Sequence, residues 1–193
     1  MGSRVGTAGP KLTGRMKKPP PTPEAQLQRI LRIAKLDGVS LVVIAGISIL
    51  FSLGDWFGMA VCVTIVGGGW MELSGRKQLL AGDATGIRRM VKAQLLVLAA
   101  IEILCVVNLK QGMSPEVREA IAGLDMPELE PAFRSAFTAT YIAVALLTVV
   151  YQGGMARYYG KKAGVVRTAL ADRARPPAPA AGWSSTAPED EVT

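Results

Sequence analysis

The chain has 193 residues, of which half are hydrophobic and 19% are charged, and its net charge is +7. Histidine is absent, which removes the commonest general base and the commonest metal ligand, including axial histidine ligation of haem. Cys62 and Cys105 lie far apart and form no CxxC pair, so neither a zinc site nor a thioredoxin-like redox motif is supported. We therefore predict no catalytic residue, no cofactor, no metal ion and no enzymatic activity.

The N-terminal residues 1–23 are basic and rich in Gly and Pro, and we predict that they form a disordered tail. A secretory signal peptide has an apolar core and a small-residue cleavage site, and this segment contains neither. An organelle transit peptide is the alternative, although the segment has little helical amphipathicity.

Residues 24–35 have a different pattern, with apolar side chains at helical spacing between basic ones. This pattern has two interpretations. The stretch either lies in the headgroup layer of a membrane as an amphipathic helix or continues the first membrane helix into the cytosol. The apolar residues are Leu27, Ile30, Leu31 and Ala34.

Four apolar blocks follow, and nearly all charges lie between or outside them. A helix needs about 20 apolar residues to cross a hydrocarbon core about 30 Å thick. The blocks predict an all-α membrane bundle of four transmembrane helices within residues 24–162, followed by a disordered tail at 163–193. The predicted spans are about 36–54, 57–74, 90–109 and 133–153, with a hydrophilic loop at 75–89 and an external polar segment at 110–132.

Local signals refine these boundaries. Gly67, Gly68 and Gly69 lie inside the second span, where consecutive glycines indicate close helix packing or a kink. Ser114 followed by Pro115 is typical of a helix start, so a short helix is predicted from Ser114 to Ala122. Asp125 to Glu128 repeats such a start signal, and the fourth span is expected to end at Gly153-Gly154.

The charges also predict an orientation. Residues 1–35 hold eight Lys and Arg against one Glu, and loop 75–92 holds five against one Asp. The external segment 109–134 holds three basic residues against five acids. Cytoplasmic loops are enriched in Lys and Arg, so both termini and the middle loop are predicted to be cytoplasmic. The basicity is then explained by topology and anionic lipid, and nucleic acid is not an expected partner.

Glu102 is the most informative single residue, because a carboxylate within hydrocarbon costs several kcal/mol unless it is paired, hydrated or protonated. It belongs to a polar stripe of the third span with Gln94, Cys105 and Asn108, which should face protein or water. The predicted orientation brings other polar side chains to the same depth. We predict a hydrogen-bonded intramembrane cluster, which would either hold the helices together or conduct a proton or cation. Its members are Glu102, Thr64, Tyr141, Thr138 and Cys105.

Two acids are expected nearer the membrane surface. Glu72 is followed at i+4 by Arg76, an order that favours an ion pair on a helix, and we predict that pair at the interface. Asp37 beside Lys35 is interpreted as a similar interfacial residue. Cys62 and Cys105 are expected to be packing residues, while a disulfide between them stays geometrically open.

The stretch GWMELSGRKQLLAGDATGIRRMVKAQLL, with YQGGMARYY further on, resembles a set of small, uncharacterised, four-helix bacterial inner-membrane proteins. The resemblance covers about residues 36–162. It implies the four-helix layout and a bacterial inner-membrane location, and it implies no known activity, substrate or site residue.

Two functions are carried forward from the sequence. The first is a non-enzymatic structural or accessory subunit, whose partners are the lipid bilayer and either another copy of the chain or an unknown membrane protein. The second is a small transporter or ion-coupled channel that uses Glu102 as its proton-sensitive group.

Overall fold

The computed structural model describes residues 21–53, 55–123 and 129–175, and within them every element is a helix. Four of these helices are long and apolar enough to cross a membrane, as the sequence predicts, and α4 is the short exception. The helices are α1 (Pro23–Phe51), α2 (Trp56–Leu80), α3 (Thr85–Gln111), α4 (Pro115–Ala122) and α5 (Leu129–Ala174).

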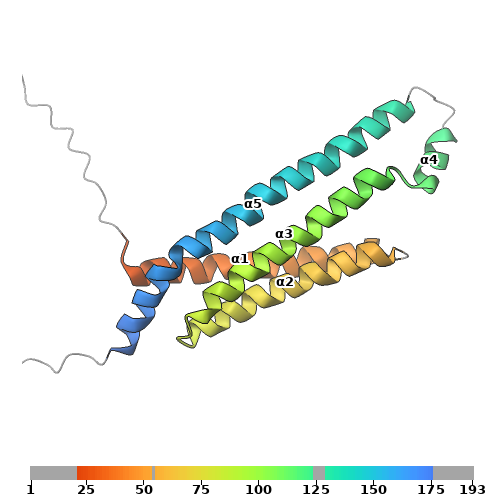
Figure 1. The fold of residues 1–193 in the computed structure, drawn as a ribbon. Coiled ribbons are helices and arrows are strands. Elements are labelled where there is room, and N and C mark those ends of the chain that lie inside the picture. The colour runs from red at the N-terminus through yellow and green to blue at the C-terminus, as the bar shows by residue number, and fades with distance from the viewer. Residues whose placement is uncertain (1–20, 54, 124–128, 176–193) are drawn as a thin grey trace, which may run out of the picture.

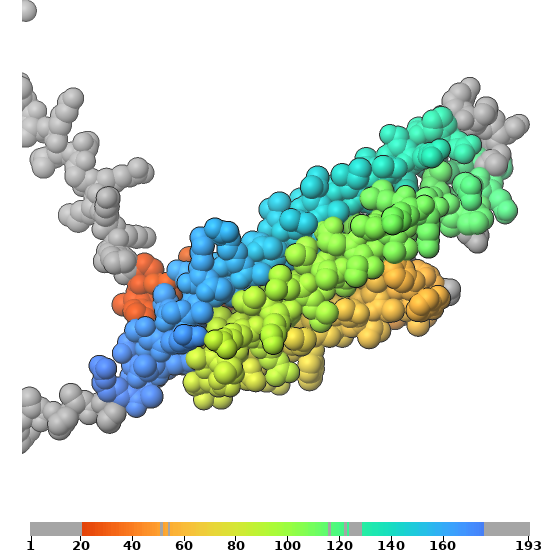
Figure 2. All heavy atoms as spheres, viewed as in Figure 1, coloured from red at the N-terminus to blue at the C-terminus, as the bar shows by residue number. Residues whose placement is uncertain are grey.

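The four long helices form one elongated bundle, with α3 lying between α2 and α5 (Figures 1 and 2). One end holds the start of α1, the end of α5 and the turn between α2 and α3, and we call it the termini end (Figure 1). The other end holds the turn between α1 and α2 together with α4, and we call it the α4 end. Both described chain ends therefore lie on the same side of the bundle.

The helices are longer than the apolar blocks. At 1.5 Å per residue the 46 residues of α5 span roughly 69 Å, more than twice a hydrocarbon core of about 30 Å. One prediction is thereby wrong, because residues 163–174, which were expected in a disordered tail, belong to α5. The helix also continues through Gly153 and Gly154, where the fourth span was predicted to end. The apolar block marks where a helix can contact lipid, whereas the helix itself continues as long as its backbone bonds and its packing allow.

The predicted hydrophilic loop at 75–89 is also mostly helical, and only residues 81–84 separate α2 from α3. Gly82 takes the left-handed region with φ of 88°, which favours glycine. Asp83 then accepts hydrogen bonds from the Thr85 hydroxyl at 2.6 Å and from its backbone N–H at 2.8 Å. These two hydrogen bonds hold the pKa of Asp83 below its usual value, and the bond from the hydroxyl has the larger effect. A tight, hydrogen-bonded turn thus replaces the expected loop.

Of the two interpretations of residues 24–35, the structure confirms the extension of the first helix. Residue 23 to residue 51 is one continuous helix, and the apolar side chains of its first part are buried against protein. They belong to the main core of the molecule, which lies at the termini end and joins α1, α2, α3 and α5. The core consists of Leu27, Ile30, Leu31, Ala34, Leu79, Ile87, Met90, Tyr159, Val166, Ala169 and Leu170.

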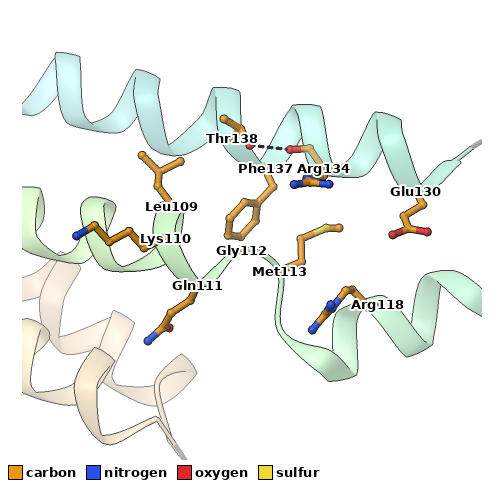
Figure 3. A pocket seen from close by; sticks show the side chains of 10 residues that line it. All are labelled: Leu109, Lys110, Gln111, Gly112, Met113, Arg118, Glu130, Arg134, Phe137 and Thr138. Carbon is orange, nitrogen blue, oxygen red and sulfur yellow. Dashed lines mark hydrogen bonds between the residues drawn. The ribbon is translucent and has the colours of Figure 1, made fainter.

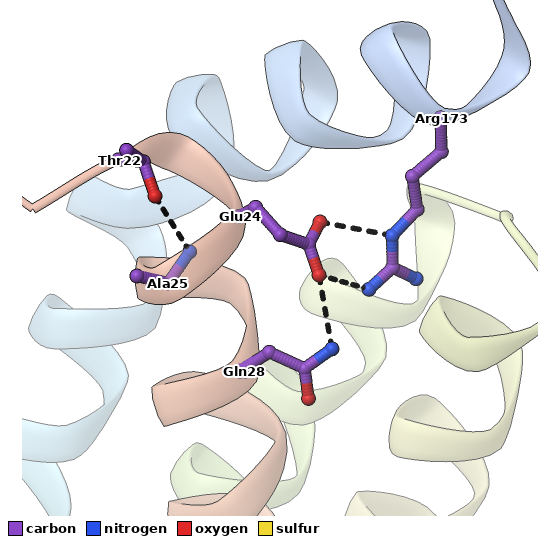
Figure 4. Close-up of polar contacts among 5 residues, drawn as sticks. All are labelled: Thr22, Glu24, Ala25, Gln28 and Arg173. Atoms are coloured by element: carbon purple, nitrogen blue, oxygen red, sulfur yellow. Dashed lines mark hydrogen bonds and ion pairs between the residues drawn. The ribbon is translucent and has the colours of Figure 1, made fainter.

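Polar contacts fasten α1 to α5 at the same end (Figure 4). Thr22 caps α1 by accepting a hydrogen bond from the Ala25 N–H at 3.3 Å. The Arg173 Nε then donates to Glu24 Oε2 at 2.9 Å, and Gln28 donates to the same carboxylate at 3.0 Å. Because Glu24 and Arg173 are exposed to solvent, which screens their charges, this pair contributes little to stability.

The surface changes character toward the α4 end. There, large apolar side chains of α1, α3 and α5 lie on the outside of the bundle. Examples are Ile44 at 63% exposure, Ile103 at 55% and Leu147 at 69%. The main apolar core therefore lies at the termini end, whereas many large apolar side chains toward the α4 end are exposed.

Glycines set the distance between neighbouring helices. A Cβ at Gly69 would lie 2.9 Å from the Gly38 carbonyl oxygen, and a Cβ at Gly75 would lie 2.7 Å from that of Gly86. Gly68 likewise faces Val97 closely, whereas a Cβ at Gly67 would meet nothing within 4 Å. The close-packing interpretation is confirmed for Gly68 and Gly69, and α2 continues through all three glycines.

The short helix predicted after Ser114 is present as α4, and the Ser114 hydroxyl accepts from the Val117 N–H at 3.4 Å. The second start signal, Asp125 to Glu128, lies outside the described residues. The tails predicted to be disordered lie mostly outside them as well, at 1–20 and 176–193.

Candidate functional site

A buried polar network joins all four long helices just beyond the main core. Its centre is the side-chain amide of Gln94 on α3, whose Nε2 donates to Asp37 Oδ2 at 2.6 Å and to Glu72 Oε2 at 2.9 Å. Asp37 comes from α1 and Glu72 from α2. One amide group thus bridges two carboxylates, which we call the acid pair.

Two tyrosines of α5 complete the network. The Tyr159 hydroxyl donates to Glu72 Oε1 at 2.6 Å, and the Tyr151 hydroxyl donates to Asp37 Oδ1 at 2.9 Å. Each carboxylate therefore accepts one bond from Gln94 and one from a tyrosine. Glu72 and Gln94 are completely buried, and Asp37 is 7% exposed.

The glycine contacts explain how these side chains meet. Asp37 precedes Gly38, which lies against Gly69, and Glu72 lies one turn after Gly69 on α2. Since the backbones of α1 and α2 approach closely at Gly69, a side chain as short as Asp37 reaches the centre of the bundle. The sequence signal was the set of glycines, which predicts close packing but does not say which polar residues it brings together.

The acid pair has no cationic partner among the described residues. The one ion pair found there joins Arg173 to Glu24 at the termini end, and no Lys or Arg donates a hydrogen bond to Asp37 or Glu72. Burying two adjacent negative charges without a compensating cation costs several kcal/mol. Two carboxylates that share a site cannot both ionise freely, so this arrangement favours uptake of a proton or another cation.

Two sequence interpretations are corrected here. Glu72 forms no ion pair with Arg76, whose Nε instead donates to the Leu31 carbonyl oxygen at 3.1 Å. Asp37 is not a surface residue beside Lys35 but is buried in the network. The preference for ion pairs at i and i+4 describes an isolated helix. In this bundle α2 packs against the other helices, and Glu72 and Arg76 each bond to a group of another helix instead of to each other.

The predicted cluster around Glu102 does not form as a hydrogen-bonded unit. Thr64 and Thr138 donate to the backbone carbonyls of Ala60 and Arg134 in their own helices, at 2.8 and 2.9 Å. Glu102 is half-buried, and its Oε1 has no hydrogen-bond partner.

The polar stripe of α3 does face protein, as predicted. Gln94 and Cys105 are buried at 0% and 1% exposure, and Glu102 and Asn108 are half-buried. Cys62 and Cys105 are buried free thiols, so the disulfide left open by the sequence is not formed. Of the residues that the sequence singled out on α3, the structure gives the central bonding role to Gln94 and not to Glu102.

A cavity of about 600 Å³ adjoins the acid pair and extends toward the α4 end. Its lining follows α1 from Asp37 to Ser48 and includes residues of α2, α3 and α5. In Figure 1 the ribbons of α1 and α5 cross near the termini end and separate toward the α4 end. The bond between Tyr151 and Asp37 joins the two helices where the cavity begins. Its lining is Asp37, Ser40, Leu41, Ile44, Ala45, Ser48, Ser52, Asp55, Gly58, Val61, Cys62, Ile65, Ile101, Leu104, Asn108, Tyr141, Tyr151 and Gln152.

Two features of this lining are chemically informative. It contains two aspartates and no Lys or Arg. It also contains Gln152, which is 4% exposed and whose Oε1 has no hydrogen-bond partner. Leaving a buried carbonyl oxygen without a donor costs about 1–3 kcal/mol, and this oxygen belongs to a side chain of the cavity lining.

A second, smaller hollow of about 300 Å³ lies at the α4 end (Figure 3). Phe137 of α5 projects toward the segment around Gly112, and Arg118 and Arg134 lie on opposite sides of the opening. Its charged side chains belong to exposed positions.

Among the described residues no three of Cys, Asp and Glu come together as a set of metal ligands, and the chain has no histidine. The network offers two carboxylates, and its two tyrosine hydroxyls already donate hydrogen bonds to them.

Comparisons with known proteins add nothing to this chemistry. The chain matches no family model, no curated protein and no solved structure. The resemblance to uncharacterised four-helix inner-membrane proteins stays a prediction, and the function must be argued from the site.

Proposed function

We propose that this chain is a non-enzymatic membrane protein that binds a monovalent cation in its cavity in exchange for a proton held by Asp37 and Glu72. The observation that carries the proposal is the buried acid pair without a cationic partner, of which one member, Asp37, lines a cavity. The cation would take the place of the proton as the compensating charge, and the proton would leave to water.

The membrane setting of this proposal rests on the surface of the bundle and on the charge pattern. The exposed apolar side chains toward the α4 end suit contact with lipid, and the basic residues gather toward the termini end. We infer that both termini are cytoplasmic and that the membrane is a bacterial inner membrane. The packed core at the termini end would then project into the cytoplasm.

The two functions predicted from the sequence fare differently. Cation-for-proton exchange is the elementary step of a proton-coupled carrier, so the transporter reading gains support, with the acid pair in place of Glu102. A purely structural or accessory subunit has no need for a buried acid pair beside a cavity, and that reading is the weaker proposal.

Infrared spectroscopy of the full chain in lipid nanodiscs tests the proposal, because a protonated carboxyl has a C=O stretch distinct from that of a carboxylate. We expect the band of a protonated carboxyl at neutral pH. It should vanish in the double variant Asp37→Asn/Glu72→Gln, in which the replacements keep the shapes of the side chains.

Glu102→Gln is the matched control, because Glu102 is a carboxylate in a long apolar helix outside the network, and its buried Oε1 has no hydrogen-bond partner. The proposal fails if the band is absent at neutral pH, or if Glu102→Gln removes it while the double variant keeps it.

A further inference from the structure

We infer that the ligand is an organic ammonium ion, a protonated amine that carries an apolar body. The inference rests on the proposed function and specifies the chemical class of its cation. It is drawn from the size of the cavity, from the distribution of polar groups in its lining and from the unpartnered oxygen of Gln152.

The cavity is larger than an inorganic ion requires. Its volume of about 600 Å³ lies within the range of roughly 300–1,000 Å³ that is typical of sites for small organic ligands. A bare inorganic cation needs several oxygen ligands close together, whereas much of this lining is aliphatic. The aliphatic residues are Leu41, Ile44, Ala45, Val61, Ile65, Ile101 and Leu104.

The charge of the ligand follows from the acids. Asp37 lies at one end of the cavity beside Tyr151, Asp55 also lines it, and no basic side chain does. An anionic ligand would meet two like charges and no compensating one. A cationic head at Asp37 would instead be attracted by the carboxylate and lie close to the ring of Tyr151, where cation–π attraction is available.

The hydrogen-bonding capacity of the ligand follows from Gln152. Gln152 belongs to the cavity lining, and its Oε1 is buried without a donor, so a ligand that draws this side chain toward the cavity would satisfy the oxygen. A quaternary ammonium has no N–H and would leave this oxygen unsatisfied. An ammonium with N–H groups can donate both to Gln152 Oε1 and to Asp37.

The remaining geometry accounts for the apolar body. Away from Asp37 the cavity follows the diverging helices α1 and α5 toward the α4 end, where apolar side chains of both helices lie on the surface (Figure 1). A ligand with its ammonium at the acid pair would therefore place its hydrocarbon part among the aliphatic residues. Burial of that part away from water favours binding.

Binding of 4-phenylbutylammonium to the full chain in nanodiscs tests the inference, with its N,N,N-trimethyl analogue and with Na⁺ and K⁺ as comparison ligands. Calorimetry gives the affinity, empty nanodiscs correct for partition into lipid, and a pH indicator in weak buffer reports protons released. We expect saturable binding of the primary ammonium with release of about one proton, and binding at least tenfold weaker for the trimethyl analogue.

Two variants locate the contacts. Asp37→Asn should abolish proton release and weaken binding about 100-fold or more. Gln152→Leu should weaken the primary ammonium about tenfold but change the trimethyl analogue little, because only the former uses the Gln152 oxygen. Glu102→Gln, which lies outside the lining, should bind like the wild type.

The possible failures are distinct. If the infrared band of the acid pair is present but only Na⁺ or K⁺ releases the proton, the organic class is wrong and the proposed function stands. If both phenylbutyl compounds bind equally and Gln152→Leu affects them alike, the role of Gln152 is overturned. If the band itself is absent, the proposed function falls first.

Discussion

At the scale of the residue, the most consequential side chain is Gln94. Its single amide nitrogen donates to both members of the acid pair, and no other described side chain bridges them. Its own Oε1 is buried without a partner. An amide is suited to this position because it can bridge two carboxylates without adding a permanent charge, so the pair remains able to exchange its proton.

Gln94→Leu should destabilise the folded chain by about 1–3 kcal/mol, because it removes a buried donor and leaves two buried acceptors less satisfied. The free energy of unfolding can be measured in mixed micelles with increasing SDS, followed by circular dichroism. Gln78→Leu is the control, since Gln78 makes no side-chain hydrogen bond among the described residues and its Oε1 is already without a partner. Equal losses for the two variants would contradict the bridging role of Gln94.

The residue scale is also where the sequence was least informative. Asp37 was predicted to be an interfacial residue because it lies near Lys35, and Glu72 was predicted to pair with Arg76 four residues later. Both predictions were wrong. A carboxylate near the end of an apolar block has the same local pattern whether it faces headgroups or the centre of a bundle. The difference depends on which helix face is covered, which is a property of the other helices.

At the scale of the element, the spacing of the helices depends on a few glycines. Gly38 and Gly69 let the backbones of α1 and α2 approach until a Cβ on either would be crowded. This approach places Asp37 and Glu72 side by side. The glycine run in the sequence therefore serves the polar network as well as the packing of the helices.

Gly69→Ala should destabilise the bundle by about 1–3 kcal/mol, because its Cβ would lie 2.9 Å from both the Gly38 carbonyl oxygen and Val42 Cγ2. Gly67→Ala, two residues away on an open face, should be neutral or stabilising by up to about 1 kcal/mol through helix propensity. The same SDS titration measures both. A loss at position 67 as large as that at position 69 would show that crowding at the helix contact is not the cause.

At the scale of the whole molecule, the bundle has two differently built parts. The termini end buries an apolar core and ties α1 to α5 through polar contacts, including one from Lys162 to Gln26 at 2.7 Å. The part toward the α4 end exposes its apolar side chains and contains the cavity. The acid pair lies between the two parts, with the packed core on one side and the cavity on the other.

The proposed orientation predicts which positions an impermeant thiol reagent reaches in intact cells. In a background with Cys62 and Cys105 replaced by alanine, Gln111→Cys at the α4 end should react with an externally added maleimide that cannot cross membranes. Lys161→Cys at the termini end should react only after the cells are opened. Labelling in the reverse order would invert the topology, and labelling of both from outside would contradict a bundle that crosses the membrane with both termini inside.

The sequence by itself determined the number of long apolar helices, the short helix after Ser114 and the close packing at Gly68 and Gly69. These features follow from local composition and residue spacing, which do not depend on where the helix lies in the bundle. Only the tertiary structure decided how far the helices extend, which acids are buried and which side chains bond to them. The reason is physical: burial and pairing depend on surfaces contributed by segments far apart in the sequence, such as Asp37 and Tyr151, which are 114 residues apart, and no local pattern records that contact.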